Sequence, residues 1–163
     1  MEIEIKLAEY DEKPLLKKML ELHLYDLSIF DDYDLSKFGE YGYRYLDLYW
    51  TEADRFPFIL RINKKLAGFA LINKFAHTGR IDRAVAEFFV LKKYRRRGIG
   101  KKLALEIFQQ FPGRWEVCTS ANNLVAEQFW QNTIEQFAPD NIEKVKDRID
   151  DRKVIIWTFN SQK

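Results

Sequence analysis

A chain of 163 residues is long enough to bury a hydrophobic core and short enough to form one domain, which we expect to span residues 1–163. Hydrophobic residues make up 47% of the sequence and charged residues 32%, a composition that excludes an intrinsically disordered protein. The formal net charge of +2 favours no particular class of binding partner.

Cysteine and histidine are scarce in this sequence. Cys118 is the only cysteine, so no disulfide can form within the chain, as is typical of a reducing compartment. His23 and His77 are far apart and belong to no Cys/His cluster, so we predict no metal site. The N-terminal segment has neither the basic start nor the apolar run of a signal peptide, and no apolar stretch is long enough to span a bilayer. We therefore expect a cytoplasmic protein that does not bind membranes.

Periodicity in the first half of the chain predicts a strand, two helices and a hairpin. Ile3, Ile5 and Leu7 alternate with polar residues, as in a half-buried strand. Pro14 stands where the first turn of a helix tolerates proline, and leucines follow it at helical spacing. Asn63-Lys64 separates two apolar runs and predicts a hairpin turn. The predicted elements are strands over 2–7, 56–62 and 66–73, a helix from Pro14 to Leu27 and a short helix around 45–49.

The second half of the chain alternates strands with helices. An amphipathic run follows Gly100 and predicts a helix that ends at Pro112-Gly113. Asn122 or Asn123 is expected to cap the next helix. The predicted elements are strands over 84–91, 115–119 and 154–159, with helices over 103–111 and 125–137. This order, with one or two strands at the C-terminus, predicts an α/β (α+β) fold in which helices flank a single mixed, mostly antiparallel sheet.

A basic turn with two glycines joins the strand that ends near Leu91 to the following helix. The free N–H groups and the dipole of a helix N-terminus bind phosphate, and Gly98 and Gly100 let the backbone approach an anion closely. Leu103 stands where the dinucleotide-binding fingerprint needs a third glycine, and the spacing does not fit a P-loop. An ordinary strand-to-helix turn with solvated arginines is the alternative interpretation. The basic residues around the turn are Arg95, Arg96, Arg97, Lys101 and Lys102.

Two segments in this region resemble a known family. Segment 95–100, RRRGIG, is similar to the (Gln/Arg)-x-x-Gly-x-(Gly/Ala) signature of the GCN5-related N-acetyltransferases (GNAT), and it lies between a strand and a helix, as in that family. Segment 123–130, NLVAEQFW, resembles the family's Asn-x-x-Ala-x-x-Phe-Tyr segment. The predicted order of elements also agrees with the family over most of the chain. The sequence therefore resembles a GNAT acyltransferase, with the fold of that family.

The resemblance implies acetyl-CoA as cosubstrate. In the family, amides of the turn hold the pyrophosphate, and a bulge, here around Phe89, Val90 and Leu91, splays the strand from its neighbour so that the pantetheine arm lies in the gap. A backbone N–H near Val90 would polarise the thioester carbonyl. The residues that the resemblance implies at the cofactor site are Phe89, Val90, Leu91, Arg95, Arg96, Arg97, Gly98, Ile99, Gly100, Lys101 and Asn123.

The resemblance also implies direct attack by an amine, which must lose a proton to a base. Glu87 is the predicted catalytic base, because it is a carboxylate in an otherwise apolar strand just before the turn; an ion pair with Arg83 is the alternative. Trp130 stands where the family usually has a tyrosine that protonates the leaving thiolate. Since an indole does not titrate usefully, either another group supplies that proton or the thiolate leaves unassisted. Trp130 is then expected to pack in the core.

Residues 21–54 are acidic and rich in aromatic side chains, with only Lys37 and Arg44 as bases. In the family the corresponding segment covers the acceptor site, so the resemblance implies a small cationic amine, attracted by carboxylates and aromatic faces. A solvated acidic surface over aromatic packing is the alternative. The residues of this segment are the acids Glu21, Asp26, Asp31, Asp32, Asp34, Glu40, Asp47, Glu52 and Asp54 and the aromatics Tyr25, Tyr33, Tyr41, Tyr43, Tyr45, Tyr49 and Trp50.

Three other functions remain open. The basic turn would also suit a nucleic-acid-binding module, although its glycines and the acidic surface elsewhere argue against one. Trp130 leaves room for a non-catalytic coenzyme A-binding domain. Transfer of a longer acyl group, or transfer to a hydroxyl, is the third. The favoured prediction is an N-acetyltransferase that acts on a small-molecule amine and has no nucleic-acid partner, with a homodimer left open.

Overall fold

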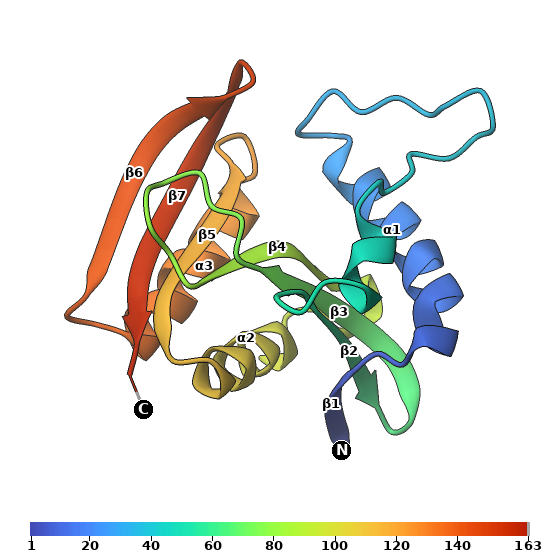
Figure 1. Ribbon diagram of the computed structural model, residues 1–163, viewed down its shortest axis with the longest axis horizontal. Coiled ribbons are helices and arrows are strands. Elements are labelled where there is room, and N and C mark those ends of the chain that lie inside the picture. Colours follow the sequence, from blue (N-terminus) through green and yellow to red (C-terminus); the bar gives the residue numbers. More distant parts are fainter. Residues whose placement is uncertain (163) are drawn as a thin grey trace.

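A seven-stranded sheet in the order β1-β2-β3-β4-β5-β7-β6 forms the centre of the computed structural model (Figure 1), which describes residues 1–162. Lys163, the last residue of the predicted domain, lies outside the described residues. The strands are β1 Ile3–Leu7, β2 Phe56–Ile62, β3 Lys65–Asn73, β4 Arg83–Val90, β5 Gly113–Ser120, β6 Ile142–Ile149 and β7 Arg152–Ser161. The helices are α1 Lys13–Leu27, α2 Ile99–Gln110 and α3 Leu124–Phe137, with 3-10 turns η1 Tyr10–Glu12, η2 Leu46–Trp50 and η3 Lys92–Tyr94.

The helices cover opposite faces of this sheet. Side chains of α1 and η2 pack on one face of β2–β4 in a cluster that includes Leu16, Leu46 and Phe69. Side chains of α2 and α3 pack on the other face in a larger cluster that includes Leu103 and Trp157. The mixed, mostly antiparallel sheet flanked by helices that the sequence predicts is therefore confirmed. Among residues 1–162, only β4 and β5 pair in parallel.

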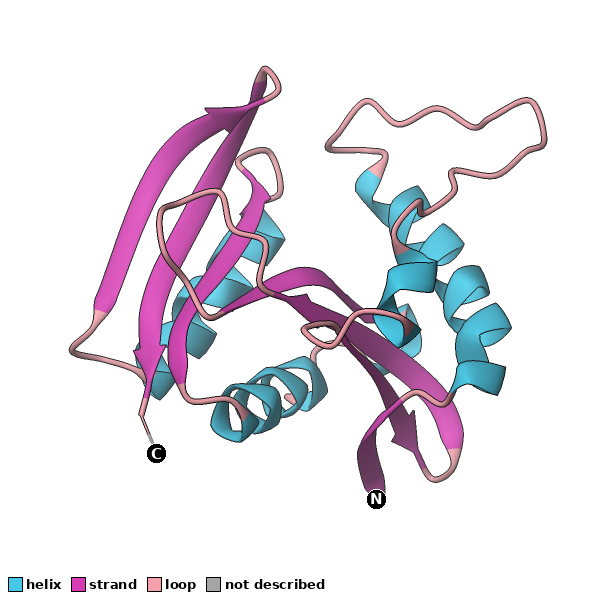
Figure 2. Cartoon of the chain, in the orientation of Figure 1, coloured by secondary structure: helices cyan, strands magenta, loops and turns pink. Residues whose placement is uncertain are grey.

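β4 and β5 separate soon after they meet. Their pairing covers only Arg83–Val85 against Trp115–Val117, whereas β3 stays paired with β4 as far as Val90. The last five residues of β4 therefore have no strand on their β5 side. Figure 2 shows that the half of the sheet with β1–β4 and the half with β5–β7 diverge beyond this pairing.

The bulge expected around Phe89, Val90 and Leu91 lies earlier in β4. The β3–β4 register shifts between Leu71 and Ile72, whose partners are Glu87 and Val85, so Ala86 is the extra residue. Phe89 instead stays in register with Phe69, and a close approach of the two strands keeps the ladder regular there. A Cβ on the neighbouring Gly68 would lie only 2.3 Å from the carbonyl oxygen of Phe89. The sequence-based position was wrong because Gly68, on the partner strand, has no side chain, so the two strands can approach closely at Phe89 without a bulge.

Two elements differ in detail from the sequence prediction. The short helix predicted around 45–49 is the 3-10 turn η2. The C-terminus has two strands, and β6 is the one that no alternation predicts, because its residues are mostly charged and exposed at the sheet edge. Asp150 and Asp151, with φ of 47° and 64°, form the β6–β7 turn in the left-handed conformation that Asp tolerates.

Candidate active site

The turn before α2 presents backbone amides at the end of β4. Gly98 is the N-cap of α2 with φ of 72°, and Arg96 before it has φ of 59°. Only glycine adopts this conformation without strain at the N-cap. Gly100 is the second residue of α2. It faces the side chains of Phe129 and Val90, since a Cβ there would lie 3.4 and 3.6 Å from them. The first-turn N–H groups of α2 have no intrahelical acceptors and are therefore available to an anion.

The guanidinium of Arg95 turns back from this helix N-terminus. Its Nε donates to Val90 O at 2.6 Å, and one terminal nitrogen donates to Asp26 Oδ2 on α1 at 2.5 Å. Lys92 adds a second ion pair to Asp26, at 3.2 Å. Burial favours the protonated carboxyl of Asp26, but hydrogen bonds from Arg95 and Lys92 outweigh burial and hold its pKa below the ordinary value. Arg95 thus ties α1 to β4, whereas Arg96 and Arg97 are exposed.

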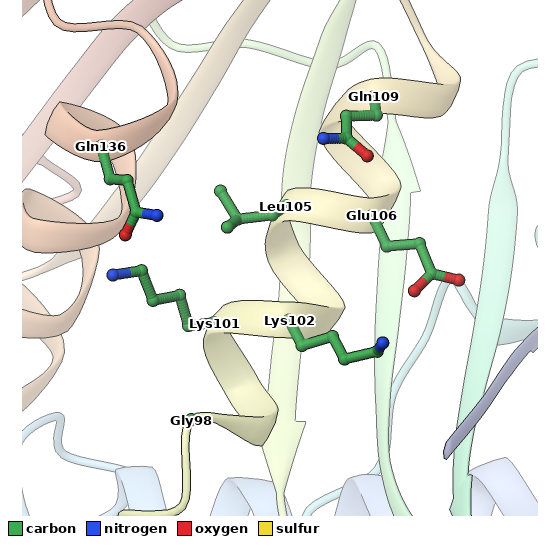
Figure 3. A pocket seen from close by; sticks show the side chains of 7 residues that line it. All are labelled: Gly98, Lys101, Lys102, Leu105, Glu106, Gln109 and Gln136. Carbon is green, nitrogen blue, oxygen red and sulfur yellow. The ribbon is translucent and has the colours of Figure 1, made fainter. Parts of the chain in front are cut away.

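A surface cavity of about 430 Å³ lies beside the turn (Figure 3). Gly98, Lys101 and Lys102 line its end nearest the turn, with Gln136 of α3 across from Lys101. Beyond the two lysines its lining is mixed, with Leu105, Glu106 and Gln109 of α2. Only the end next to the turn therefore carries positive charge.

The free edge of β4 carries unpaired backbone groups. Leu91 N donates to Ala67 O at 2.8 Å, so the groups of Val90 point to the opposite side, because backbone groups alternate along a strand. The contact of Val90 O with Arg95 agrees with this direction. The Val90 N–H therefore points away from β3, toward the side on which β4 has no paired strand beyond Val85.

Glu87 lies on the α1 face of the same strand and contacts His23. The distance from His23 Nε2 to Glu87 Oε2 is 2.7 Å, and the two side chains are 8% and 19% exposed. Phe69 meets the imidazole edge-on, at a centroid distance of 5.7 Å, and Phe89 packs at 5.4 Å. The alternative ion pair with Arg83 is not formed, because the Arg83 guanidinium stacks between Phe56 and Phe111.

Two tyrosines complete the surroundings of Glu87. Burial raises the pKa of Tyr43 above its ordinary range, and the charge of Glu87 raises it further. Burial likewise raises the pKa of Tyr49 to about 12, and its hydroxyl is buried without a hydrogen-bond partner among residues 1–162. Both phenols are therefore neutral at physiological pH. Glu87 therefore has an imidazole and uncharged phenols as its neighbours.

Sequence reasoning did not identify His23 or single out Tyr43 and Tyr49. His23 shares the buried face of α1 with Leu16 and Leu20, so a titratable residue on that face was the available signal. The tyrosines lie in and just after a long loop, and no sequence periodicity brings them to Glu87. Only the tertiary structure shows that these side chains surround one carboxylate.

Trp130 packs in the hydrophobic core, and Asn123 caps a helix. Trp130 is buried, and its ring lies 4.9 Å from that of Phe88 and 4.8 Å from that of Phe129. The expected core packing of Trp130 is therefore confirmed. Asn123 caps α3, since its Oδ1 accepts from Ala126 N at 3.0 Å. Of the two caps that the sequence allowed, Asn123 is the one used.

A loop over residues 28–45, here called the lid, crosses from α1 to the β5–β7 half. Asn122 Nδ2 donates to Phe30 O at 3.3 Å, just after β5. Arg152, at the start of β7, donates to the hydroxyl of Tyr33 at 2.9 Å and lies 3.8 Å from Asp31. The lid thus joins both halves of the molecule on the side where Glu87 lies.

Most carboxylates of the acidic segment already have partners. Glu21 accepts the N–H groups of Tyr41 and Gly42, both at 2.8 Å. Asp32 and Asp34 have no ion pair among residues 1–162. The paired acids and their cations are Asp26 with Arg95, Asp31 with Arg152, Glu40 with Lys17, Asp47 with Lys13, Glu52 with Arg55 and Asp54 with Lys74. The segment is therefore much less negative than its composition implies.

Metal and membrane features are absent from the described part of the chain. Residues 1–162 contain no group of three or more His, Cys, Asp or Glu side chains that could hold a metal ion. Among the same residues, every helix is too short or too polar to cross a membrane.

Comparisons with known proteins identify the family of this chain and similar folds. The profile of the acetyltransferase (GNAT) family matches residues 23–133, which is more than half of the chain. No curated protein matches the sequence. An acetyltransferase from Thermus thermophilus superposes with a TM-score of 0.70 at 16% identity, over 98% of this chain and 97% of that one.

Two further solved structures are similar over nearly their full length. The ribosomal-protein-S18-alanine N-acetyltransferase from Escherichia coli has a TM-score of 0.65 at 14% identity, over 99% of this chain and 96% of that one. The PaiA N-acetyltransferase from Thermoplasma acidophilum, solved with coenzyme A, has a TM-score of 0.62 at 13% identity, over 96% and 98%. At these identities the likeness shows the fold alone. Together with the profile match, it shows that this chain belongs to the acetyltransferase (GNAT) family and is an acyltransferase.

Proposed function

We propose that this enzyme transfers the acetyl group of acetyl-CoA directly to the primary amine of a small cationic acceptor, with Glu87 as general base. The observation that carries the proposal is the half-buried Glu87 carboxylate, which lies on the same strand as the free N–H of Val90 and bonds to His23 at 2.7 Å. A base and a hydrogen-bond donor three residues apart on one strand suit the two partners of an acyl transfer.

The donor side of the reaction uses backbone groups. The first-turn amides of α2 would hold the pyrophosphate, with Arg96, Arg97 and Lys101 adding positive charge. The pantetheine arm would enter the opening beside β4, where the Val90 N–H donates to the thioester carbonyl oxygen. That hydrogen bond strengthens as negative charge develops on the oxygen.

The acceptor amine attacks the carbonyl carbon once it is neutral. Glu87 takes one proton of the ammonium group, and the neutral amine forms the new C–N bond. The C–S bond then breaks to release the thiolate of coenzyme A, and the nitrogen loses its second proton to solvent as the amide forms. Trp130 is buried among aromatic rings and has no titrating group, so the proposal assigns no acid to the leaving group. A thiol with a pKa of about 8.5 makes unassisted departure feasible.

The surroundings of Glu87 favour a small cationic acceptor. Its carboxylate is a negative group close to the neutral phenols of Tyr43 and Tyr49, and aromatic faces attract ammonium groups. The lid contacts Asn122 and Arg152 across the opening, which restricts the space for a bulky acceptor. A cytoplasmic location stays a prediction.

A thiol-release assay with acetyl-CoA tests the proposal. The probes are 1,4-diaminobutane, kanamycin, and a peptide with N-terminal alanine, since the E. coli relative is named for an alanine of a ribosomal protein. We expect the diamine or the aminoglycoside to react faster than the peptide. Faster reaction of the peptide would mean that the acceptor is a polypeptide and not a small molecule. Binding of acetyl-CoA without thiol release from any probe would favour a non-catalytic coenzyme A-binding domain.

A further inference from the structure

We infer that His23 is a positioning residue, which holds the Glu87 carboxylate in the orientation that receives the acceptor's proton. The inference rests on the proposed function, because it gives His23 a purpose only if Glu87 is the base. It adds a residue from α1 to a reaction whose other proposed groups lie on β4 and in the turn.

The hydrogen bond between the two side chains fixes which atoms are free. As the base of the proposed function, Glu87 is an ionised carboxylate that can only accept, so the 2.7 Å bond to Oε2 requires His23 Nε2 to carry the proton. Oε2 is therefore engaged, and Oε1 is the oxygen left for the acceptor amine. A carboxylate without this bond would rotate about its terminal torsion, which has no strong preference.

The imidazole itself has little freedom. Phe69 and Phe89 contact it from the sheet at centroid distances of 5.7 and 5.4 Å, and the side chain is 8% exposed. One helical turn further along α1, Asp26 binds Arg95 and Lys92, which fastens this end of the helix to β4. The donor atom of His23 is thus held by the sheet on one side and by the helix on the other.

Two substitutions separate hydrogen bonding from packing. His23→Gln keeps a nitrogen donor near the place of Nε2, whereas His23→Leu keeps bulk but has no donor. We expect His23→Leu to lower kcat by roughly 10- to 100-fold, because a small misplacement of a catalytic group has this effect. We expect His23→Gln to stay within about threefold of the parent, as a retained hydrogen bond implies. His77→Gln, at the other histidine and on an exposed loop, is the matched control and should change nothing.

The measurements are kcat with the fastest amine of the thiol-release screen, and the dissociation constant of acetyl-CoA for each folded variant. The dissociation constant should be unchanged in all three. Combined with Glu87→Gln, His23→Leu should cause little further loss, because a residue that acts through Glu87 has nothing left to position. Equal losses in His23→Gln and His23→Leu, no loss in His23→Leu, or multiplied losses in the double variant would each overturn the inference. Unchanged kcat in Glu87→Gln alone would instead overturn the proposed function.

Nitrogen NMR gives a readout that needs no acceptor. The chain has two histidines, so His77→Gln leaves one imidazole to observe. We expect His23 to be the Nε2–H tautomer, with an Nε2 resonance that moves when Glu87→Gln is introduced. The Nδ1–H tautomer, or an Nε2 resonance that ignores Glu87→Gln, would overturn the inference even if no amine reacts.

Discussion

The turn before α2 and the surroundings of Glu87 are built from different parts of the polypeptide. Backbone groups of consecutive residues form the turn, and Gly98 with φ of 72° sets their direction. Side chains from α1, the lid, η2 and β4 form the surroundings of Glu87, and they come from positions as far apart as His23 and Glu87. A backbone site tolerates many side chains but few conformations, whereas a side-chain site can be remodelled one residue at a time. The donor side should therefore be the more sensitive to glycine replacement, and the acceptor side to changes of charge.

Gly98→Val tests the backbone side and has the largest expected effect. Valine at a φ of 72° is strained, so the turn should rearrange and lose its phosphate contacts. In the parent, acetyl-CoA at 100 times its dissociation constant should stabilise the fold by about 2.7 kcal/mol, and in the variant this thermal shift should vanish. Gly39→Val is the matched control, because Gly39 has a φ of 74° and lies in the lid. A full thermal shift in Gly98→Val would remove this turn from the cofactor site.

Glu87→Gln tests the side-chain side. Loss of a general base should lower kcat by roughly 100-fold near neutral pH. The deficit should shrink at high pH, because the acceptor amine then loses its proton to solvent. Rate profiles of parent and variant from pH 6 to pH 10 measure both effects. A deficit of the same size at every pH would mean that Glu87 only maintains structure.

Asp26→Asn tests the contact between the two sides. The pKa of Asp26 is held below its ordinary value, so its ion pairs stabilise the fold above about pH 4 and lose that effect as the pH falls through the lowered pKa. The variant should be less stable at pH 7 by about 1 kcal/mol, and the difference should disappear in strong acid. Thermal melts of both proteins from pH 2 to pH 7 give the comparison. A deficit that persists at pH 2 would come from packing and not from charge.

The double variant Asp32→Asn/Asp34→Asn has the smallest expected effect. These two carboxylates have no ion pair among residues 1–162, unlike Asp31, which lies 3.8 Å from Arg152. Their loss should raise KM for a cationic amine two- to fivefold, in the range of about 0.2–1 kcal/mol typical of exposed charges. The increase should fade in 1 M salt, where screening acts over about 3 Å. An unchanged KM would make the lid an ordinary solvated surface.

The same contrast explains what could be predicted from the sequence. The glycine turn and a cap at Asn122 or Asn123 were predictable, because local spacing indicates a helix start and a helix cap. Glu87 was predictable as a polar residue in an apolar strand, but its partner was not, since the fold and not the spacing brings His23 to it. The mixed sheet followed from the order of elements. β6 did not, because an exposed edge strand needs no apolar alternation.

The charge of the acidic segment shows why composition alone misleads. Nine acids and two bases between Glu21 and Asp54 suggest a strongly negative surface. In the structure, cations from α1, the segment just after β3, the turn and β7 neutralise most of those acids. Only the tertiary contacts reveal which charges remain for a substrate.

The short parallel pairing of β4 with β5 raises the question of what keeps the two halves of the sheet together. The two halves of the sheet are joined by only three residue pairs, Arg83–Val85 with Trp115–Val117. Beyond these pairs, β4 and β5 diverge. On the α2 and α3 face, however, one hydrophobic cluster includes residues of both halves of the sheet. It extends from Leu60 and Val90 to Trp115 and Ile155. That shared hydrophobic cluster holds the two halves together where their strands are barely paired. The two halves of the sheet can therefore diverge beyond Val85 without becoming two separately folding units.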